Sequence, residues 1–166
     1  MICPSCGHEN IQGADECDNC GADLRTADIP RPSSGFEELL VARPLATLAG
    51  GPPLTAAPDT PAAEAVRQMQ AAAVGCLVVD DGERVRGIIT ERDLLLRATD
   101  LDLAEVSVGE LMTADPVVLR PDDSIAVAIH KMAVGGFRHI PLVENGHATA
   151  VVSARDVFRY ILDIID

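Results

Sequence analysis

The chain has 166 residues, of which 48% are hydrophobic and 23% charged, a composition that fits one ordinary globular domain with a small appendage. Its net charge of −13 argues against a general affinity for nucleic acid or anionic membranes, because both bind basic surfaces. The sequence shows neither an apolar run of the roughly 18 residues that span a membrane nor a signal peptide. We therefore expect a cytoplasmic protein.

The first 24 residues contain four of the five cysteines, arranged as two C-x-x-C-G turns. Such turns direct pairs of thiolates toward one centre, and together they complete a tetrahedral metal site. Disulfides are the alternative, but thiols stay reduced in the cytoplasm. The spacing therefore predicts a small metal-binding domain over residues 1–24, with these ligands: Cys3, Cys6, Cys17 and Cys20.

This segment resembles the zinc ribbons that open many bacterial and archaeal proteins. Zinc is the favoured metal, with iron as the alternative, since the first turn also resembles a rubredoxin knuckle and four thiolates accept either metal. The segment carries acidic residues but no Lys or Arg, which opposes phosphate binding. We interpret it as a folding element or as a docking surface for an unidentified protein.

Residues 25–61 contain seven of the eleven prolines, which is typical of loops and linkers. We expect a linker over residues 25–43, with one apolar helical turn at 36–41.

Residues 44–96 are repeated without gaps at an offset of 63, so we expect two copies of one unit, over residues 44–104 and 105–166. Each copy predicts a β-α-β-β-α order. A unit of this size leaves one sheet face uncovered, so we expect an α/β (α+β) domain in which the copies pack with pseudo-two-fold symmetry. The predicted strands are 54–55, 76–79, 85–89, 117–119, 139–143 and 150–152, and the helices are 62–72, 90–96, 124–134 and 154–164.

Both copies end with the same seven-residue pattern: a small residue and two apolar residues at the end of a predicted strand, followed by the motif T/S-x-R-D. As a capping box, the hydroxyl and the acid would stabilise a helix without any ligand. As a binding motif, the same helix start would favour a phosphate, and the acid would accept from ribose hydroxyls. Repetition of the small residue and the arginine favours nucleotide binding. The residues are Gly87, Thr90, Arg92 and Asp93, then Ala150, Ser153, Arg155 and Asp156.

These endings, with residues 111–117 and 137–143, resemble the tandem CBS-domain module over residues 44–166. The resemblance implies that Thr90 and Ser153 contact phosphate and that Asp93 and Asp156 contact ribose. It also implies adenine cradled by the strand that contains Pro141, and it makes Arg138 and His139 phosphate contacts. Their counterparts in the first copy are Gly75 and Cys76, so the two sites are expected to be unequal.

The resemblance implies a regulatory module that senses AMP, ADP or ATP, modulates a protein partner and forms a homodimer through the helices that flank its sheets. We find no catalytic constellation or P-loop and expect no enzyme activity. Two alternatives stay open: a structural adaptor whose T/S-x-x-D elements are only caps, and an electron-transfer protein with iron in the ribbon. His130 and Lys131, at the end of a predicted helix, are expected to be solvated.

Overall fold

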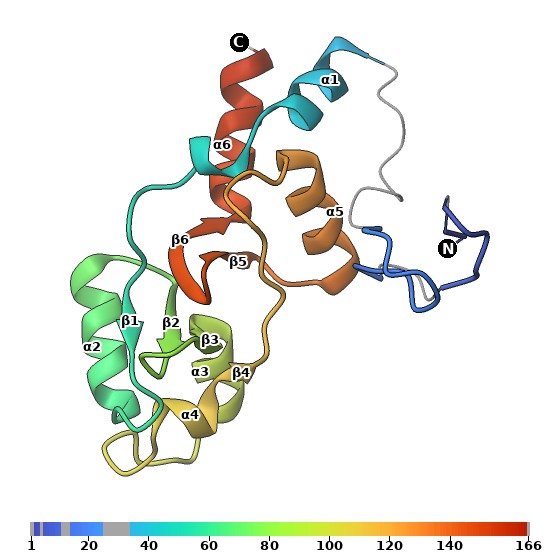
Figure 1. The fold of residues 1–166 in the computed structure, drawn as a ribbon. Helices are drawn as coiled ribbons and strands as arrows, with labels where there is room; N and C mark the ends of the chain where they lie inside the picture. The colour runs from blue at the N-terminus through green and yellow to red at the C-terminus, as the bar shows by residue number, and fades with distance from the viewer. Residues whose placement is uncertain (1, 4, 11–13, 25–33, 166) are drawn as a thin grey trace. The chain divides into compact units, whose positions relative to one another are not determined.

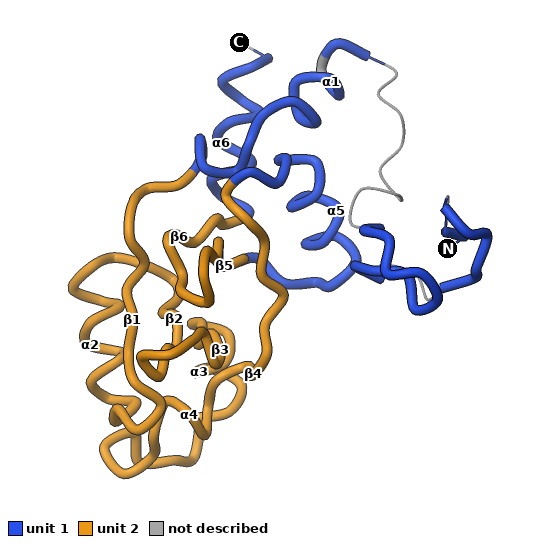
Figure 2. Tube along the Cα trace, viewed as in Figure 1, with its two compact units in different colours: residues 1–48, 122–138, 154–166 blue, residues 49–121, 139–153 orange. Residues whose placement is uncertain are grey.

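The computed structural model describes residues 2–3, 5–10, 14–24 and 34–165. The chain forms two compact units, each assembled from separate segments (Figure 2). Unit 1 comprises residues 1–48, 122–138 and 154–166, and unit 2 comprises residues 49–121 and 139–153. The predicted linker lies outside the described residues as far as residue 33.

Unit 1 contains the cysteine-rich segment and three helices: α1 (Gly35–Ala42), α5 (Ile125–Gly135) and α6 (Ala154–Ile165), with a 3-10 turn, η1 (Leu45–Thr47), after α1. Ser34 caps α1 and Ser124 caps α5, each accepting a backbone N–H three residues on. Gly136 then ends α5 in the left-handed conformation that glycine adopts readily. None of the described helices is long and apolar enough to cross a membrane.

Unit 2 contains two sheets, and Figure 1 shows their hairpins. The four-stranded sheet has the order β1-β2-β3-β4, with β1 parallel to β2 and the other pairs antiparallel. The elements in chain order are β1 (Thr55–Ala56), α2 (Ala62–Ala72), β2 (Cys76–Asp80), β3 (Val85–Thr90), α3 (Glu91–Arg97), α4 (Val108–Leu111) and β4 (Thr113–Ala114); β5 (His139–Glu144) and β6 (His147–Ser153) form the second sheet.

A buried apolar cluster joins α2, α4 and the sheet of the first copy. It consists of Ala62, Ala65, Met69, Leu77, Val79, Ile89, Val108 and Leu111. Three of these positions lie at i, i+3 and i+7 of α2, the spacing of one helix face. Met69 is therefore on the inward face of α2, while Val66 is half-buried.

The duplication is visible in the backbone hydrogen bonds as well as in the sequence. The N–H of Glu91 donates to the carbonyl of Gly75 over 3.1 Å, and the equivalent residues 63 positions later, Ala154 and Arg138, make the same bond over 2.8 Å. Each hairpin also carries a bulge at the same place, at Val79 in one copy and Leu142 in the other. The hairpins of the two copies therefore share a hydrogen bond to the following helix and the position of a bulge.

The strand predicted over residues 117–119 is wrong, and Pro141 explains why. In the first copy, the N–H of Val78 donates to the carbonyl of Leu54 over 2.9 Å and helps to hold β1. The equivalent of Val78 is Pro141, which has no N–H to donate. Only an isolated bridge between Leu119 and Leu142 remains here. The second sheet is consequently a two-stranded hairpin.

Helix α4 was not predicted, although its signature is present in the sequence. Ser107 and Glu110 form a capping box, in which the backbone N–H and the hydroxyl of Ser107 donate to the Glu110 carboxylate over 2.8 and 2.7 Å. This S-x-x-E pattern is the ordinary start signal of a helix. The pattern therefore could have located α4.

Candidate metal centre and nucleotide site

The two C-x-x-C-G turns fold alike. The N–H of Gly7 donates to the carbonyl of Cys3 over 2.9 Å, and the N–H of Gly21 donates to that of Cys17 over 2.8 Å. Both glycines have positive φ, 72° and 68°, which a β-carbon would strain. The tight turn explains why a glycine follows each pair of cysteines.

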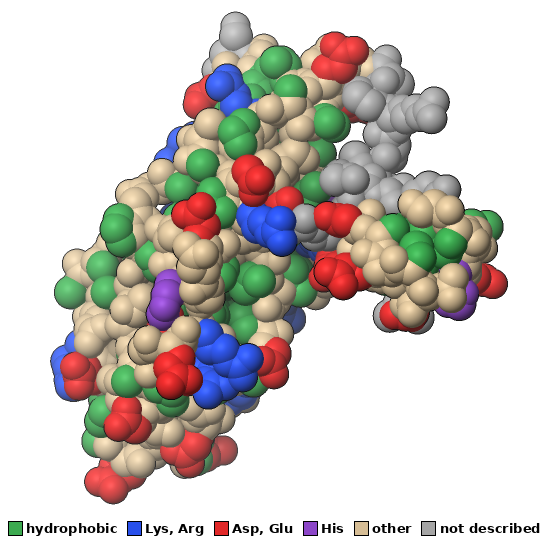
Figure 3. Space-filling view, in the orientation of Figure 1, with side chains coloured by type: hydrophobic (Ala, Val, Ile, Leu, Met, Phe, Trp, Pro, Cys, Tyr) green, Lys and Arg blue, Asp and Glu red, His purple; other side chains and the backbone are tan. Residues whose placement is uncertain are grey.

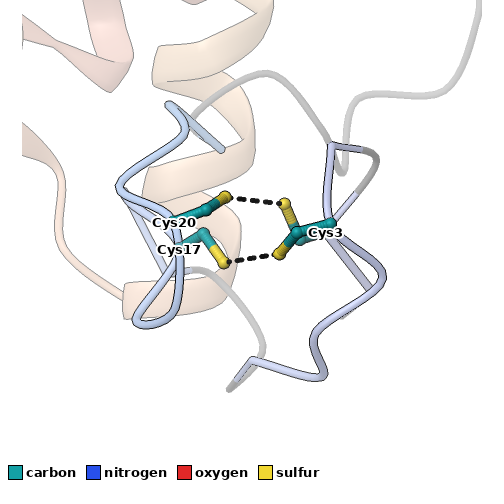
Figure 4. Close-up of side chains that lie close together, drawn as sticks. Cys3, Cys17 and Cys20 are labelled. Carbon is teal, nitrogen blue, oxygen red and sulfur yellow. Dashed lines mark hydrogen bonds between the residues drawn. The ribbon is translucent and has the colours of Figure 1, made fainter.

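The four predicted ligands lie together in the structure. Their sulfur atoms are all within 4.8 Å of one another, with 3.7 Å from Cys3 to Cys20 and 3.6 Å from Cys6 to Cys17 (Figure 4). A tetrahedron with Zn–S bonds of about 2.3 Å has edges of about 3.8 Å. A disulfide would need about 2.05 Å. The sulfur cluster therefore fits one tetrahedral metal ion.

Nitrogen donors surround the sulfur atoms. The N–H of Ser5 donates to Cys3 over 3.4 Å, and the side-chain amides of Asn10 and Asn19 donate to Cys17 and Cys6 over 3.6 Å each. Such contacts stabilise thiolates and orient metal ligands. The two asparagines were not predicted, because no sequence motif distinguishes them from other polar loop residues.

The pKa values of the thiols show what the cluster requires. Burial opposes ionisation of Cys17, but hydrogen bonds from the backbone of Cys20 and Asn19 outweigh it and lower its pKa to about 6. At Cys20 the Ala22 amide favours the thiolate, yet the sulfur atoms of Cys6, Cys17 and Cys3, together with burial, raise its pKa to about 12. Four thiolates this close need a cation among them.

The apolar core of the ribbon is very small. Among the described residues of the ribbon, Cys3, Cys17 and Leu24 form the buried cluster, with Ala14 and Ala22 packed against them. Domains of this size generally need a metal or disulfides to fold, because they bury little surface. Two of these three buried side chains are themselves candidate ligands, so the candidate metal site lies within the described core of the ribbon.

At the first T/S-x-x-D ending, the predicted capping box is present. Thr90 ends β3 and caps α3: its hydroxyl oxygen accepts the N–H of Asp93 over 3.3 Å, and its own N–H donates to Asp93 Oδ2 over 3.0 Å. The Thr90 hydroxyl also donates to Oδ2, over 2.6 Å. Arg92 is exposed beside this pair.

The second carboxylate oxygen of Asp93 joins α3 to β4. Asp93 Oδ1 accepts the Thr113 hydroxyl over 3.1 Å and lies 3.6 Å from Arg97 Nη2. The Arg97 guanidinium also donates to the carbonyls of Leu111 and Met112. The sequence did not predict the contacts of Thr113 and Arg97 with Asp93. Arg97 lies in the first predicted copy and Thr113 in the second, and no motif links them.

The small residue of the first ending has a structural cause. A β-carbon built on Gly87 would lie 2.4 Å from Met112 Sδ and 2.9 Å from the Thr113 carbonyl. Gly87 pairs with Ala114 across β3 and β4, so the close approach of β4 requires glycine here. At the equivalent position in the second copy, Ala150 pairs with Leu142 and is buried.

The residues predicted around the second ending lie as follows. Ser153 is the last residue of β6 and pairs with His139, the first residue of β5; Pro141 is buried in β5. Arg155 and Asp156 lie in the first turn of α6. Arg138 is exposed and directly precedes β5.

His139 also lies beside the first copy. A β-carbon on Gly75 would be 3.5 Å from His139 Nε2 and 3.5 Å from Glu91 Oε2. An imidazole of the second copy and a carboxylate of the first therefore both approach the glycine whose counterpart is Arg138. Both distances are ordinary van der Waals contacts, so the space beside Gly75 would admit a β-carbon, and the inequality of the two sites stays a prediction.

Several known proteins resemble this chain. An uncharacterized 17.7 kDa protein of Acidianus ambivalens is 38% identical over 109 residues, which are 64% of this chain and 66% of that protein. The CBS domain-containing protein CBSCBSPB5 of Arabidopsis thaliana is 36% identical over 115 residues, which are 68% of this chain but only 20% of that protein. The chain thus spans two thirds or less of these two relatives.

A solved structure, the CBS domain protein PAE2072 from Pyrobaculum aerophilum complexed with AMP, matches with a TM-score of 0.66 at 27% identity and covers 74% of this chain and 98% of that one. The family model for the CBS domain matches residues 46–100 and 108–163, and the model for a zinc-ribbon domain matches residues 2–24. The chain therefore belongs to the CBS-domain family, with two CBS domains in tandem behind an N-terminal zinc ribbon.

Proposed function

We propose that the CBS pair binds an adenine nucleotide and that its occupancy modulates contact with a protein partner. The observation that carries the proposal is the Thr90–Asp93 pair, built on a backbone pattern that the second copy repeats. It is supported by the relative PAE2072, whose solved structure holds AMP. Thr90, Arg92, Asp93, Ser153, Arg155 and Asp156 are the proposed phosphate and ribose contacts, with Arg138, His139 and Pro141 beside them.

The first copy offers a specific exchange of hydrogen bonds. The Thr90 hydroxyl now donates its proton to Asp93 Oδ2. A phosphate oxygen would accept the hydrogen bond from the Thr90 hydroxyl in place of Asp93. The Asp93 carboxylate could then accept hydrogen bonds from ribose hydroxyls. Arg92 is exposed and can add a positive charge beside the phosphate. The ligand would thus replace a local contact instead of leaving a polar group unpaired.

Thermal unfolding with AMP, ADP and ATP tests this proposal. A ligand that binds only the folded protein adds about 2.7 kcal/mol at a hundredfold excess over its dissociation constant. We expect at least one of the three nucleotides to raise the unfolding temperature, by an amount that grows with the logarithm of its concentration. If none of them changes it, the nucleotide proposal is wrong.

A second candidate, the structural adaptor, is favoured by the complete capping box between Thr90 and Asp93. In that case the pair only stabilises α3, the CBS pair has no ligand, and the ribbon is the docking surface. The nucleotide titration separates the two candidates, because an adaptor shows no shift while its fold stays intact.

For the ribbon we propose a structural zinc ion held by Cys3, Cys6, Cys17 and Cys20. A tetrahedral ion with four protein ligands has no open position for a substrate, so its role is to fold the ribbon. Iron in the same site would support electron transfer instead. Elemental analysis and a visible spectrum distinguish the two metals, since zinc thiolates are colourless and iron thiolates absorb visible light.

We further propose that the protein is a homodimer, assembled through helices that flank the sheets. Leu95 on α3 and Phe158 on α6 occupy equivalent positions of the two copies and are 77% and 62% exposed. Large apolar side chains at repeated exposed positions are typical of an interface. Replacing both by Glu should convert the dimer to a monomer in light scattering, whereas Val134→Glu, at another exposed apolar position, should not.

A further inference from the structure

Lys131 is the only lysine in the sequence, and it is not where a lysine is expected. Its side chain on α5 is only 10% exposed, so the prediction that it is solvated is wrong. A buried ammonium is strongly unfavourable unless an opposite charge accompanies it. That charge is supplied by Asp15 of the ribbon, whose carboxylate forms an ion pair with Lys131.

The first CBS repeat provides an internal comparison. The position equivalent to Lys131 is Gln68 on α2, whose side-chain amide donates to Glu64 of the same helix over 3.1 Å. A neutral residue with a partner in its own helix therefore satisfies this position. The second repeat instead carries a cation whose partner lies 116 residues away in sequence. The helix itself does not require lysine; the contact with the ribbon does.

The ribbon matches this cation in charge and in geometry. It has no Lys or Arg, and acidic side chains are visible on the face that Figure 3 draws. The carbonyl of Asp15 accepts the N–H of Leu24 over 2.8 Å, and Asp15 is two residues from the candidate ligand Cys17. The fold of the ribbon therefore fixes the backbone from which the Asp15 carboxylate reaches Lys131.

We infer that the ribbon is a metal-dependent clamp on α5: the metal-loaded ribbon holds Asp15 against Lys131, and loss of the metal uncovers the lysine. The inference rests on the proposed metal site, because the buried cluster seen in the described part of the ribbon consists largely of the candidate ligands themselves. The clamped helix ends at Gly135 and leads within three residues to Arg138, a proposed nucleotide contact. The partner of this ribbon is thus the second CBS domain of its own chain.

Amine acylation tests the clamp directly, because Lys131 supplies the only side-chain amine. The metal-loaded protein and the chelator-treated, reduced protein are pulsed with an acetylating ester, and the peptide that contains Lys131 is quantified by mass spectrometry. We expect labelling of Lys131 to be roughly tenfold slower in the metal-loaded protein, as for an amine that reacts only after a local opening. Equal rates in the two states would overturn the metal dependence.

Two neighbouring substitutions isolate the contact itself. Asp15→Asn and Glu16→Gln each remove one negative charge from an exposed acid of the ribbon, and of these two acids Asp15 is the one seen to form an ion pair with Lys131 among the described contacts. In the metal-loaded protein, we expect Asp15→Asn to speed labelling of Lys131 several-fold, with metal content unchanged, and Glu16→Gln to have no effect. Identical labelling of the two variants would overturn the contact.

Separate measurements test the metal site and the contact between Asp15 and Lys131. If elemental analysis finds no metal after zinc is supplied, the proposed zinc site and the metal dependence are both wrong. The comparison of Asp15→Asn with Glu16→Gln still decides whether the ribbon covers Lys131. Lys131→Gln, which copies Gln68 of the first repeat, should in turn speed chelator removal of zinc if the clamp holds.

Discussion

The Thr90 hydroxyl and the Asp93 carboxylate lie 2.6 Å apart at the junction of β3 and α3. The same two groups close the capping box and are the proposed phosphate and ribose contacts of the first repeat. The helix cap and the proposed nucleotide contacts therefore involve the same pair of side chains. They can be separated only by a substitution that keeps one role and removes the other.

Asp93→Asn is that substitution, because an amide oxygen can still accept the N–H of Thr90 but carries no charge. We expect it to cost less stability than Asp93→Ala, which loses the cap and about 1 kcal/mol. Both should abolish the response of the first site to nucleotide in a thermal shift assay. A nucleotide response that survives in Asp93→Asn would show that this acid is only a cap; Asp156→Asn is the matched variant in the second repeat.

Gly87→Ala should destabilise the protein by roughly 1–3 kcal/mol, because the new methyl group would overlap Met112 and the Thr113 carbonyl. The reverse change in the second repeat, Ala150→Gly, should cost about 0.5–1 kcal/mol through backbone entropy. Urea unfolding of both variants measures the difference. Adding Met112→Ala should recover part of the loss in Gly87→Ala; no recovery would assign the cost to the backbone contact with Thr113.

Removing the metal should unfold the ribbon and leave the CBS pair folded. We expect Cys6→Ser, or a chelator, to collapse the amide signals of residues 2–24 in an NMR spectrum, since two of the three buried core residues described in the ribbon are candidate ligands. Signals of the sheet β1-β2-β3-β4 should persist. Cys76→Ala provides the control: this cysteine is buried in β2, so metal content should not change. Loss of metal there would contradict the ligand set.

Acid should weaken the hairpin turn after β2 through Asp81. Backbone N–H groups of Arg84 and Glu83 and the Arg86 side chain lower the pKa of its carboxyl from 3.8 to about 2. A lowered folded pKa means that this stabilisation is complete above about pH 4 and is lost as the pH falls through about 2. In Asp81→Asn the unfolding free energy should depend less on pH over this window, as urea titrations would show. An unchanged pH dependence would argue against the assignment.

The sequence predicted those features whose physical cause is local. The C-x-x-C-G spacing and the capping pattern of Thr90 and Asp93 are each complete within a few residues, and the structure confirms both arrangements. The gapless repeat likewise predicted the β-α-β-β-α order. Even the error at residues 117–119 has a local cause, since the absence of an N–H at Pro141 can be read from the aligned copies.

Other contacts have causes that no local pattern carries. Lys131 is buried and forms an ion pair with an acid 116 residues away, and the imidazole of His139 lies beside a glycine of the other copy. Gly87 was read as part of a ligand motif, whereas its immediate constraint is the side chain of Met112. Each of these contacts depends on which distant segments meet in the folded chain. Local sequence patterns such as motif spacing and hydrophobic periodicity do not specify that.

Pro141 has a consequence for how the protein avoids aggregation. Two-stranded sheets expose edges that can recruit a strand from another molecule. At the middle of β5, Pro141 offers no donor to such a strand, while its carbonyl already accepts the N–H of Leu119. Pro141 therefore has two effects. It prevents a regular first strand in the second repeat, and it makes the edge of the remaining hairpin a poor partner for a strand of a neighbouring chain.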